Sequence, residues 1–447
     1  MNNLKAGFCR MNITPMLGID LIGYFKTRLA DGVLDELELN ALALSAGDKK
    51  VLIFSLDNEG INRETIADLA KAITEATGVE QDSIYIHCTH THTGPFIKLG
   101  SDKPLEVEYY NWMRRRLCDA AVMALEDLKP ARMGWAIGNA PNIAFVRRFR
   151  MKDGSVKTNP GVNNPDIVAP IGDVDERVNV LRFDREGAES IVLVNFGNHP
   201  DTVGGNKISG DWPTLMRHSF EKAIDNVKCM MINGVQGDVN HVNVKPTGGY
   251  LNDTFNDFDD VSRGYGHTRF MGRVVAAGVM QVFDKVCYVD VDSIKSKKVT
   301  IKVPSNMPTP EEAKEAHRIN DLHNAGKDSE LPYKGMMLTT IVAEAGRMVR
   351  LEHGPEAFDM ELTAIAIGNL VLIGLPGEPF TGIGRALKEA EGWDLVLPSC
   401  LTNGSEGYFP MQDAYDEGGY EARSSKFAAG VAEFLIKEGT KLLDSMR

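Results

Sequence analysis

The chain has 447 residues, of which 43% are hydrophobic and 25% are charged, as in ordinary water-soluble globular proteins. Its net charge of −13 and pI of about 5.3 argue against nucleic acid and anionic membrane surfaces as partners. No apolar run is long enough to span a bilayer, so we expect no stable membrane insertion.

Strands and helices alternate through the first half of the chain. Residues 37–57 predict a hairpin that turns at Ala46-Gly47-Asp48. Apolar residues at helical spacing over 63–76, followed by a strand at 83–87, predict a βαβ unit with a parallel strand pair. The other elements predicted here are an edge strand at 5–15, an amphipathic helix at 105–128, a strand at 131–138 and a loop rich in Asn, Pro, Gly and Arg at 140–176.

The second half of the chain continues the same pattern. A second hairpin is predicted over 178–196, and the apolar run 370–375 predicts a strand that is buried on both faces. Strands are also predicted at 229–232, 286–303, 358–366 and 395–400, helices at 213–224, 268–283, 309–324, 340–350, 378–390 and 426–446, and loops at 246–266 and 402–423. We find no repeat and no linker, so residues 1–447 are expected to form a single domain.

Residues 83–95 contain three histidines within six positions, His87, His90 and His92, and Gly94-Pro95 ends any regular structure there. A histidine cluster at the end of a strand is suited to holding a metal ion or a catalytic base. In extended backbone His90 and His92 point to opposite sides, so we expect one to bind a metal and the other to face substrate or support a ligand. The alternative is that two of the three are ordinary loop or core histidines.

Polar side chains also follow other predicted strands. In open α/β sheets, ligands bind beyond the carboxyl ends of the strands, so we expect these loops to converge on one crevice. Two histidines, a glutamate and one open position form a common catalytic zinc site. The side chains at strand ends are His90, His92, His199, Asp201, Asp238, His241 and Glu378.

An ordered set of short motifs resembles those of the neutral/alkaline, non-lysosomal ceramidases. The motifs are Ala6-Gly7 with Ile13-Thr-Pro15, Thr89-His-Thr-His-Thr-Gly-Pro95, Ile208-Ser-Gly-Asp211, Gly237-Asp-Val239, Leu375-Pro-Gly-Glu378, and Gly407-Tyr408 with Gly419-Tyr-Glu421. They run nearly from end to end in the family's order. The resemblance implies an α/β fold of mixed β-sheets with flanking helices, a neutral-ceramidase-like catalytic domain.

The resemblance also implies a Zn²⁺ site and a set of substrate contacts. His92 is expected to face the substrate, and Arg147 to contact it, with Arg148 as the other match for this arginine. Tyr408 is implied as one of the zinc ligands. Because a neutral phenol binds zinc weakly, the alternative for Tyr408 is a buried ring whose hydroxyl is satisfied by a neighbour. The zinc ligands that the family implies are His90, His199, Glu378 and Tyr408.

The chain departs from the family at a residue that matters for chemistry. The family motif ends Gly-Asp-x-Ser-Pro-Asn, whereas this chain has Gly237-Asp-Val-Asn240-His241. An asparagine has no nucleophilic hydroxyl, so serine-based covalent catalysis at this position is excluded. Asn240 is still able to donate a hydrogen bond to an oxyanion.

Other departures concern the surroundings of the enzyme. We find no room for the family's C-terminal β-sandwich domain and no apolar export signal, and the six cysteines are scattered without a CxxC pair. Free thiols are typical of a reducing compartment, so we expect a cytoplasmic protein with a small soluble substrate.

These observations predict a zinc-dependent hydrolase that cleaves an amide (N-acyl) bond with a metal-activated water. His92 or Asp238 would move the proton, and Arg147 or Asn240 would stabilise the oxyanion. Further candidates are Arg148 and His241 for substrate binding, and Asp201 or Asp211 for orienting a ligating histidine, with helix capping as the alternative for Asp211. The same site suits an ester or a glycosidic bond, and a non-catalytic ligand-binding relative is the third alternative. The sequence leaves homo-oligomerisation open.

Overall fold

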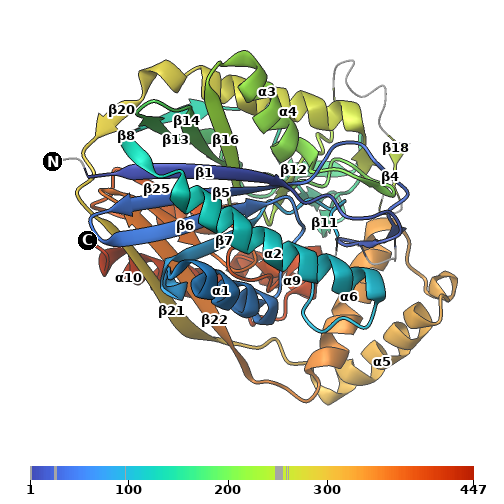
Figure 1. Ribbon diagram of the computed structural model, residues 1–447. Helices are drawn as coiled ribbons and strands as arrows, with labels where there is room; N and C mark the ends of the chain where they lie inside the picture. Colours follow the sequence, from blue (N-terminus) through green and yellow to red (C-terminus); the bar gives the residue numbers. More distant parts are fainter. Residues whose placement is uncertain (1–2, 25–27, 96, 247–254, 258, 260) are drawn as a thin grey trace.

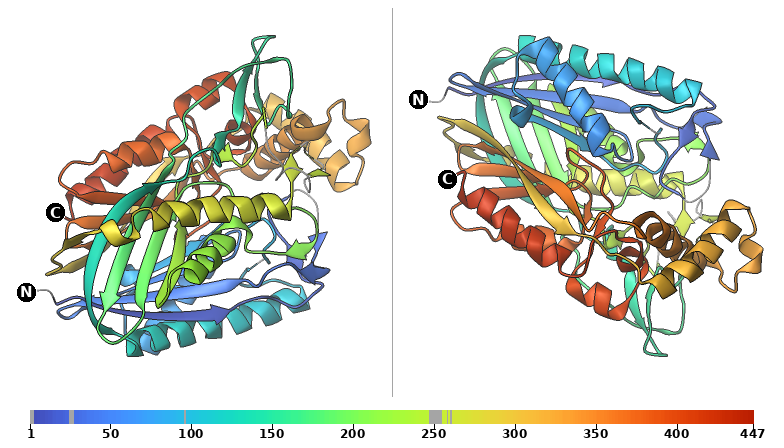
Figure 2. Two further views of the ribbon diagram at one scale, coloured as in Figure 1. Left: turned by 90° about the horizontal axis from the view of Figure 1, so that it is seen from above. Right: turned by 90° about the horizontal axis from the view of Figure 1, so that it is seen from below.

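Two β-sheets packed face to face lie between two outer layers of helices (Figures 1 and 2). The computed structural model describes residues 3–24, 28–95, 97–246, 255–257, 259 and 261–447. Both views of Figure 2 show helices α2 (Pro104–Glu126) and α10 (Val431–Asp444) on opposite outer sides, with the sheets between them. The expected α/β class, with mixed sheets and flanking helices, is confirmed.

The larger sheet has nine strands within the described part of the chain. Both predicted hairpins are antiparallel pairs in it, and the βαβ unit has its two strands parallel. In spatial order the strands are β16 (Val227–Asn233), β14 (Ser190–Phe196), β13 (Arg177–Arg185), β8 (Lys129–Asn139), β1 (Lys5–Asn12), β5 (Glu38–Ala46), β6 (Lys49–Leu56) and β7 (Ile84–Cys88), with β20 (Cys287–Val289) also paired to β8. The prediction that residues 5–15 form an edge strand is wrong, because β1 lies between β5 and β8.

The smaller sheet has four strands in the same part of the chain, in the order β21 (Ile294–Pro304), β22 (Ala357–Ile367), β23 (Leu370–Gly374) and β25 (Leu395–Ser399). The strand predicted over 286–303 is divided, since its first part joins the larger sheet as β20 and its second part joins the smaller sheet as β21. The run 370–375 is buried as expected, because both faces of β23 are covered.

Successive side chains of each strand point to opposite faces of its sheet and so pack in different layers. Leu42 and Leu44 of β5 pack in the core between the two sheets, whereas Leu39 and Ala41 pack against α1 (Arg63–Thr77) and α2. Helices α3 (Asp211–Ala223) and α4 (Tyr265–Met280) cover the part of the larger sheet around β13, β14 and β16. Helices α7 (Thr381–Lys388) and α10 cover the outer face of the smaller sheet. None of the described helices is long and apolar enough to cross a membrane.

Helices α5 (Pro310–Asn324) and α6 (Gly335–Leu351) form a helical arm beside the sheets (Figure 1). They pack on each other through their own small apolar cluster. A capping box begins α5, in which the hydroxyl of Thr309 accepts from the backbone N–H of Glu312. This arm forms one wall of a surface groove.

Regions predicted as loops contain short regular elements. Residues 140–176 include a three-stranded sheet, β11–β10–β12 (Val156–Thr158, Arg148–Met151, Ile167–Pro170), and residues 402–423 include α8 (Gln412–Glu417) and α9 (Tyr420–Ser424). Such short elements lack the periodicity that reveals longer ones. Much of the predicted loop 246–266 lies outside the described residues. The other short pairs are β24–β26 (Glu378–Pro379, Tyr408–Phe409), β17–β9 (Val239–Asn240, Phe145–Val146), β15–β4 (Lys207–Ile208, Gly32–Val33), β2–β3 (Asp20–Leu21, Arg28–Leu29) and β18–β19 (Phe255–Asn256, Ser262–Arg263).

A buried ion-pair network fastens α3 to the larger sheet and makes stability depend on pH. Arg217 is fully buried, and its Nη2 lies 2.6 Å from Asp57 Oδ2 and 3.0 Å from Glu38 Oε2. Burial alone would raise the pKa of Glu38, but the charge of Arg217, with His218 and Arg10, lowers it to about 2. A lowered pKa contributes stability above the ordinary value of 4.5, and this contribution disappears as the pH falls toward 2.

We therefore expect Glu38→Gln to flatten the loss of stability in acid. The shift corresponds to roughly 3 kcal/mol at neutral pH, of which about 2 kcal/mol is lost by pH 3. Urea unfolding at pH 6 and pH 3 should show the smaller difference in the variant. Glu36→Gln, which changes an exposed neighbour, is the matched control. Equal pH dependence of unfolding in Glu38→Gln and the wild type would contradict the assignment.

Candidate metal centre

The loops after β7, β14 and β16 meet at one point, where a single buried amide joins two of them. The side-chain amide of Asn233, the last residue of β16, donates to the backbone carbonyls of Thr89 and Asn198 at 3.0 and 3.1 Å. These two residues directly precede His90 and His199. The expected convergence of strand-end loops is therefore present.

The backbone at His90 brings the paired histidines to the same side. His90 has φ +78°, a left-handed conformation that costs a residue with a Cβ of order 1 kcal/mol or more. As a result, the Nε2 atoms of His90 and His92 lie 3.2 Å apart. The expectation that the two side chains point to opposite sides is wrong, because it assumed extended backbone. Strain of this kind is retained where a site needs it.

Three donor atoms from three loops surround one small volume. The Nε2 atom of His90 lies 3.2 Å from His199 Nε2 and 3.2 Å from Glu378 Oε2, and His199 Nε2 lies 3.6 Å from the same oxygen. A tetrahedral zinc ion with bonds of about 2.0–2.1 Å separates its ligand atoms by about 3.3–3.4 Å. All three side chains are buried. The spacing of these donors therefore suits such an ion.

Hydrogen bonds behind the histidines aim their lone pairs at this volume. The Nδ1 of His90 lies 2.8 Å from the carbonyl oxygen of Glu59, and the Nδ1 of His199 lies 3.4 Å from that of Gln236. A carbonyl accepts only, so these contacts place a proton on Nδ1 and leave Nε2 as the atom that faces the shared volume, where it is able to bind a metal ion in place of a second proton. Glu378 Oε2 is buried and has no hydrogen-bond partner among the described residues. Converging lone pairs without donors are unfavourable unless a cation lies between them. The cluster of His90, His92 and His199 is thus able to hold a metal ion.

The electrostatics of the cluster also favour a cation. Burial lowers the pKa of His90, but the charge of Glu378 outweighs it and raises that pKa to about 9. For Glu378, burial acts to raise the pKa, and the His90 charge nevertheless brings it below its ordinary value. A positive charge is thus stabilised where the donors meet.

Glu378 and Tyr408 are held beside each other by a short parallel strand pair. They are register partners in β24 and β26, and the Glu378 N–H donates to the Gly407 carbonyl at 2.9 Å. Gly237 packs on this segment so closely that a Cβ there would lie 2.4 Å from the carbonyl oxygen of Glu378. Position 237 therefore requires glycine, because only glycine allows this close approach to the strand β24 that carries Glu378.

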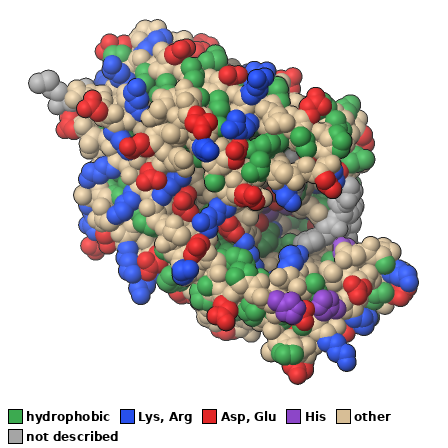
Figure 3. All heavy atoms as spheres, turned by 60° about the horizontal axis from the view of Figure 1, so that its bottom comes forward, with side chains coloured by type: hydrophobic (Ala, Val, Ile, Leu, Met, Phe, Trp, Pro, Cys, Tyr) green, Lys and Arg blue, Asp and Glu red, His purple; other side chains and the backbone are tan. Residues whose placement is uncertain are grey.

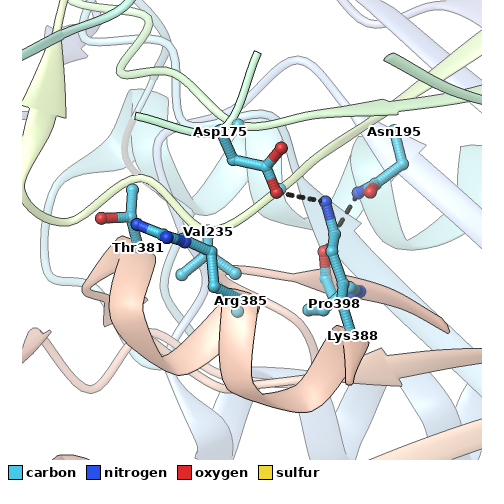
Figure 4. Close-up of a pocket in the computed structure, with 10 residues that line it drawn as sticks. Asp175, Asn195, Val235, Thr381, Arg385, Lys388 and Pro398 are labelled. Carbon is cyan, nitrogen blue, oxygen red and sulfur yellow. Dashed lines mark hydrogen bonds and ion pairs between the residues drawn. The ribbon is translucent and has the colours of Figure 1, made fainter. Parts of the chain in front are cut away.

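Helix α7, which follows Glu378, is anchored at both ends. At its start, the carboxylate of Asp238 accepts from the backbone N–H and the hydroxyl of Thr381, at 2.7 and 2.9 Å. At its end, Lys388 donates to Asp175 at 2.8 Å across a cavity of about 20 Å³, enough for one water molecule (Figure 4). These contacts hold the glutamate loop against the larger sheet.

A small pocket opens onto the donor cluster. It has a volume of about 40 Å³, and we call it the metal pocket; its wall includes His92, His199, Arg147, Asn159, Met336 and Tyr408. Arg147 is buried, donates to Glu421 at 2.6 Å and to the Gly237 carbonyl at 2.7 Å, and its guanidinium carbon lies 5.3 Å from the centre of the Tyr408 ring. Arg147 and Tyr408 thus line the same pocket as His92 and His199.

Other predicted residues lie behind or away from this pocket. Asn240 donates to Asn159 Oδ1 at 2.9 Å and so reaches the metal pocket only through that neighbour. Asp238 caps α7, and burial raises its pKa to about 6. Two more are held elsewhere: Arg148 by Asp413 and Glu417, at 3.1 and 3.4 Å, and His241 by the Ser262 carbonyl, at 2.7 Å. Asp211, the first residue of α3, accepts from the N–H groups of Thr202 and Val203 and so anchors the loop that follows β14.

Asp201, predicted to orient a ligating histidine, lies beside His92, and sequence reasoning did not find the partners that hold it there. The Nδ1 of His92 lies 3.8 Å from Asp201 Oδ1, and that carboxylate accepts from Tyr24 at 2.5 Å and from Arg263 at 2.9 and 2.6 Å. A Cβ at Gly23 would lie 2.7 Å from His92 Nδ1, so the Gly23 backbone closes the space behind the ring. Burial lowers the pKa of His92 to about 3, which keeps the imidazole neutral at pH 7.

Three residues of the site carry little or no signal in a single sequence. Tyr24, Asn233 and Arg263 act through partners far away in the chain, and each residue type is common in turns and cores. His87 is a structural histidine, since its two nitrogens lie 2.9 Å from the Cys400 carbonyl and from the N–H of Asn233. The one hint was the position of Asn233 at a predicted strand end before glycine.

Comparisons with known proteins connect this geometry to solved structures. No family model and no curated protein sequence matches the chain. A neutral ceramidase from Pseudomonas aeruginosa is similar in structure, with a TM-score of 0.74 and 16% identity over 100% of this chain and 75% of that one. A ceramidase complexed with C2 gives a TM-score of 0.71 and 16% identity over 100% and 76%. At this identity the likeness establishes the fold, and the chain has the fold of the neutral ceramidases, as its motifs predicted.

Proposed function

We propose that the protein is a Zn²⁺-dependent hydrolase that cleaves the amide bond of a small N-acyl substrate. The observation that carries the proposal is the convergence of His90 Nε2, His199 Nε2 and Glu378 Oε2 within 3.2–3.6 Å of one another. Tyr408 is the proposed fourth ligand, since it is the register partner of Glu378 and lines the same pocket. The two structural neighbours are ceramidases, and a ceramidase cleaves an amide.

The bound metal would supply a Lewis acid that lowers the pKa of a water ligand toward about 7 and polarises a carbonyl. The chain's own residues would supply the rest. His92 lies beside the donors, and the nearby Asp201 carboxylate favours its protonated form, so it would accept a proton from the attacking water and later pass it to the leaving amine. Arg147 keeps a permanent positive charge at the pocket wall, where charge develops on the amide oxygen.

The other residues of the network hold these groups in place. Asp201 faces the far side of the His92 ring and is itself fixed by Tyr24 and Arg263. Asn240 fixes the pocket residue Asn159 through its amide. A reducing compartment suits the chain, because all six cysteines are free thiols in the structure, and we therefore place the enzyme in the cytoplasm.

A matched substrate panel tests the bond type. We expect the zinc-loaded protein to hydrolyse N-octanoyl amides, and to lose this activity on treatment with a chelator and regain it with added Zn²⁺. The panel includes octanoyl esters and octyl glycosides of similar size. Hydrolysis of glycosides alone, or of none of the three classes by protein that contains stoichiometric zinc, would overturn the amidase proposal.

A further inference from the structure

A large groove continues from the metal pocket along the helical arm. Its volume is about 780 Å³, and its walls come from residues 155–162 of the small three-stranded sheet, residues 332–340 at the start of α6 and residues 417–423 around α9. We call it the arm groove. Asn159, Met336 and Tyr420 line both the arm groove and the metal pocket, so the two are continuous. Figure 3 shows the surface hollowed between the arm, at lower right, and the rest of the molecule.

The size of the groove indicates that it holds most of the substrate. The metal pocket, at about 40 Å³, has room for only a few atoms. The arm groove falls within the range of about 300–1,000 Å³ that is typical of small-molecule sites. Its apolar lining includes Tyr333, Met336, Met337 and Val162. A substrate whose scissile bond reaches the donor cluster therefore extends past these apolar side chains, which lie among polar ones.

The same groove carries an excess of positive charge in a chain whose net charge is −13. Its charged lining residues are Lys157, Lys334, Arg423 and Glu417. The one carboxylate is already paired, since Glu417 lies 2.5 Å from Arg150 and 3.4 Å from Arg148. Lys157 and Lys334 form no ion pair with any described residue. Lys157 lies two residues before Asn159 and Lys334 two residues before Met336, so both lysines line the groove close in sequence to residues that it shares with the metal pocket.

We propose that the substrate carries a negatively charged group, separated from the scissile amide by an apolar segment and bound by Lys157 and Lys334. This inference rests on the proposed function and names its substrate class: an N-acylated ω-amino acid or an ω-carboxyacyl amide. The apolar segment covers the methionines of the arm, and the anion is bound by two lysines from two different walls of the groove. An exposed, hydrated ion pair of this kind contributes affinity and orientation through two modest attractions.

The first experiment compares charged substrates with uncharged isosteres. N-octanoyl-6-aminohexanoate and its terminal carboxamide place the charge on the amine half, and the monoanilide of suberic acid and its ω-amide place it on the acyl half. We expect KM to be at least tenfold lower for the acid than for the amide in one of the two pairs. Lys157→Met and Lys334→Met should each raise KM for that acid about fivefold and leave the amide unchanged. Lys152→Met changes an exposed lysine of the same small sheet outside the groove and is the control.

A second experiment separates failure of this inference from failure of the proposed function. Calorimetric titration measures binding of two acids, each compared with its carboxamide. The acids are N-octylsulfonyl-6-aminohexanoate and the same monoanilide of suberic acid. A zinc chelator is present, so that binding is read without turnover. Tighter binding of an acid, lost in the Lys157→Met/Lys334→Met double variant, supports the inference even if no amide is hydrolysed. Equal affinity for acid and carboxamide in both pairs, or a preference that survives in the double variant, overturns it even if amides are hydrolysed well.

Discussion

Replacing Glu378 by Gln will abolish stoichiometric metal binding and lower kcat/KM for an N-acyl amide by at least about 1,000-fold. The carboxylate oxygen that lies 3.2 Å from His90 Nε2 has no hydrogen-bond partner among the described residues, so a neutral amide in its place loses the charge that balances a cation. A catalytic metal contributes several kcal/mol of transition-state stabilisation, and about 4 kcal/mol corresponds to a thousandfold in rate. Elemental analysis of purified protein and steady-state kinetics measure the two effects.

The design includes a matched control and a readout that does not depend on activity. Glu389→Gln changes an exposed glutamate at the end of α7 and should keep both metal and activity. Metal that binds only the folded protein stabilises it, by about 4 kcal/mol at a thousandfold excess over Kd. A chelator should therefore lower the Tm of the wild type and of Glu389→Gln, but not that of Glu378→Gln. Full metal content in Glu378→Gln would contradict the assignment of this residue as a ligand.

The sequence predicts the framework of this site because the framework depends on local patterns. The hairpins and the βαβ unit show the periodicity of their elements, and the apolar run at 370–375 is identified as a strand by its short length and the turn residues on either side. Parallel strands end at the same edge of a sheet, so His90, His199 and Glu378 were expected to meet before any distance was known. Each of the strands before these residues has a parallel partner, β7 with β6, β14 with β16 and β23 with β25, but the strands lie in two sheets, and antiparallel pairings separate β7 from β14.

The details of the site depend on contacts that no local pattern reveals. The left-handed backbone of His90 reverses the side on which its ring lies, and it is stabilised by tertiary hydrogen bonds such as the one to the carbonyl of Glu59. Asn233 binds the carbonyl of Thr89, which is 144 positions away in the chain. Tyr24 donates to Asp201, which is 177 positions away. The three-stranded sheet at 148–170 is too short for a period to be recognised, although it forms a wall of the arm groove.

His92 is assigned to proton transfer, but its position also suits a metal ligand, because its Nε2 lies as close to His90 Nε2 as a metal ligand would. If His92 transfers protons, then His92→Ala will lower kcat by about 1,000-fold, within the range for general acid–base catalysis, while metal content stays stoichiometric. Tyr408→Phe should then weaken metal binding. If His92 is instead a ligand, His92→Ala will lose the metal and Tyr408→Phe will keep it.

Two carboxylates near His92, those of Asp201 and Asp259, test whether the network around the His92 ring orients it. Asp201 and Asp259 both accept hydrogen bonds from Arg263, but the ion-pair distance of 3.8 Å to His92 Nδ1 belongs to Asp201. Asp201→Asn should lower kcat by 10- to 100-fold, the range typical of residues that orient a catalytic histidine, with KM nearly unchanged. Asp259→Asn removes a similar partner of Arg263 and should have a clearly smaller effect on kcat. Equal losses in the two variants would mean that the network supports Arg263 and the fold around it, and that the orientation of His92 does not depend on Asp201.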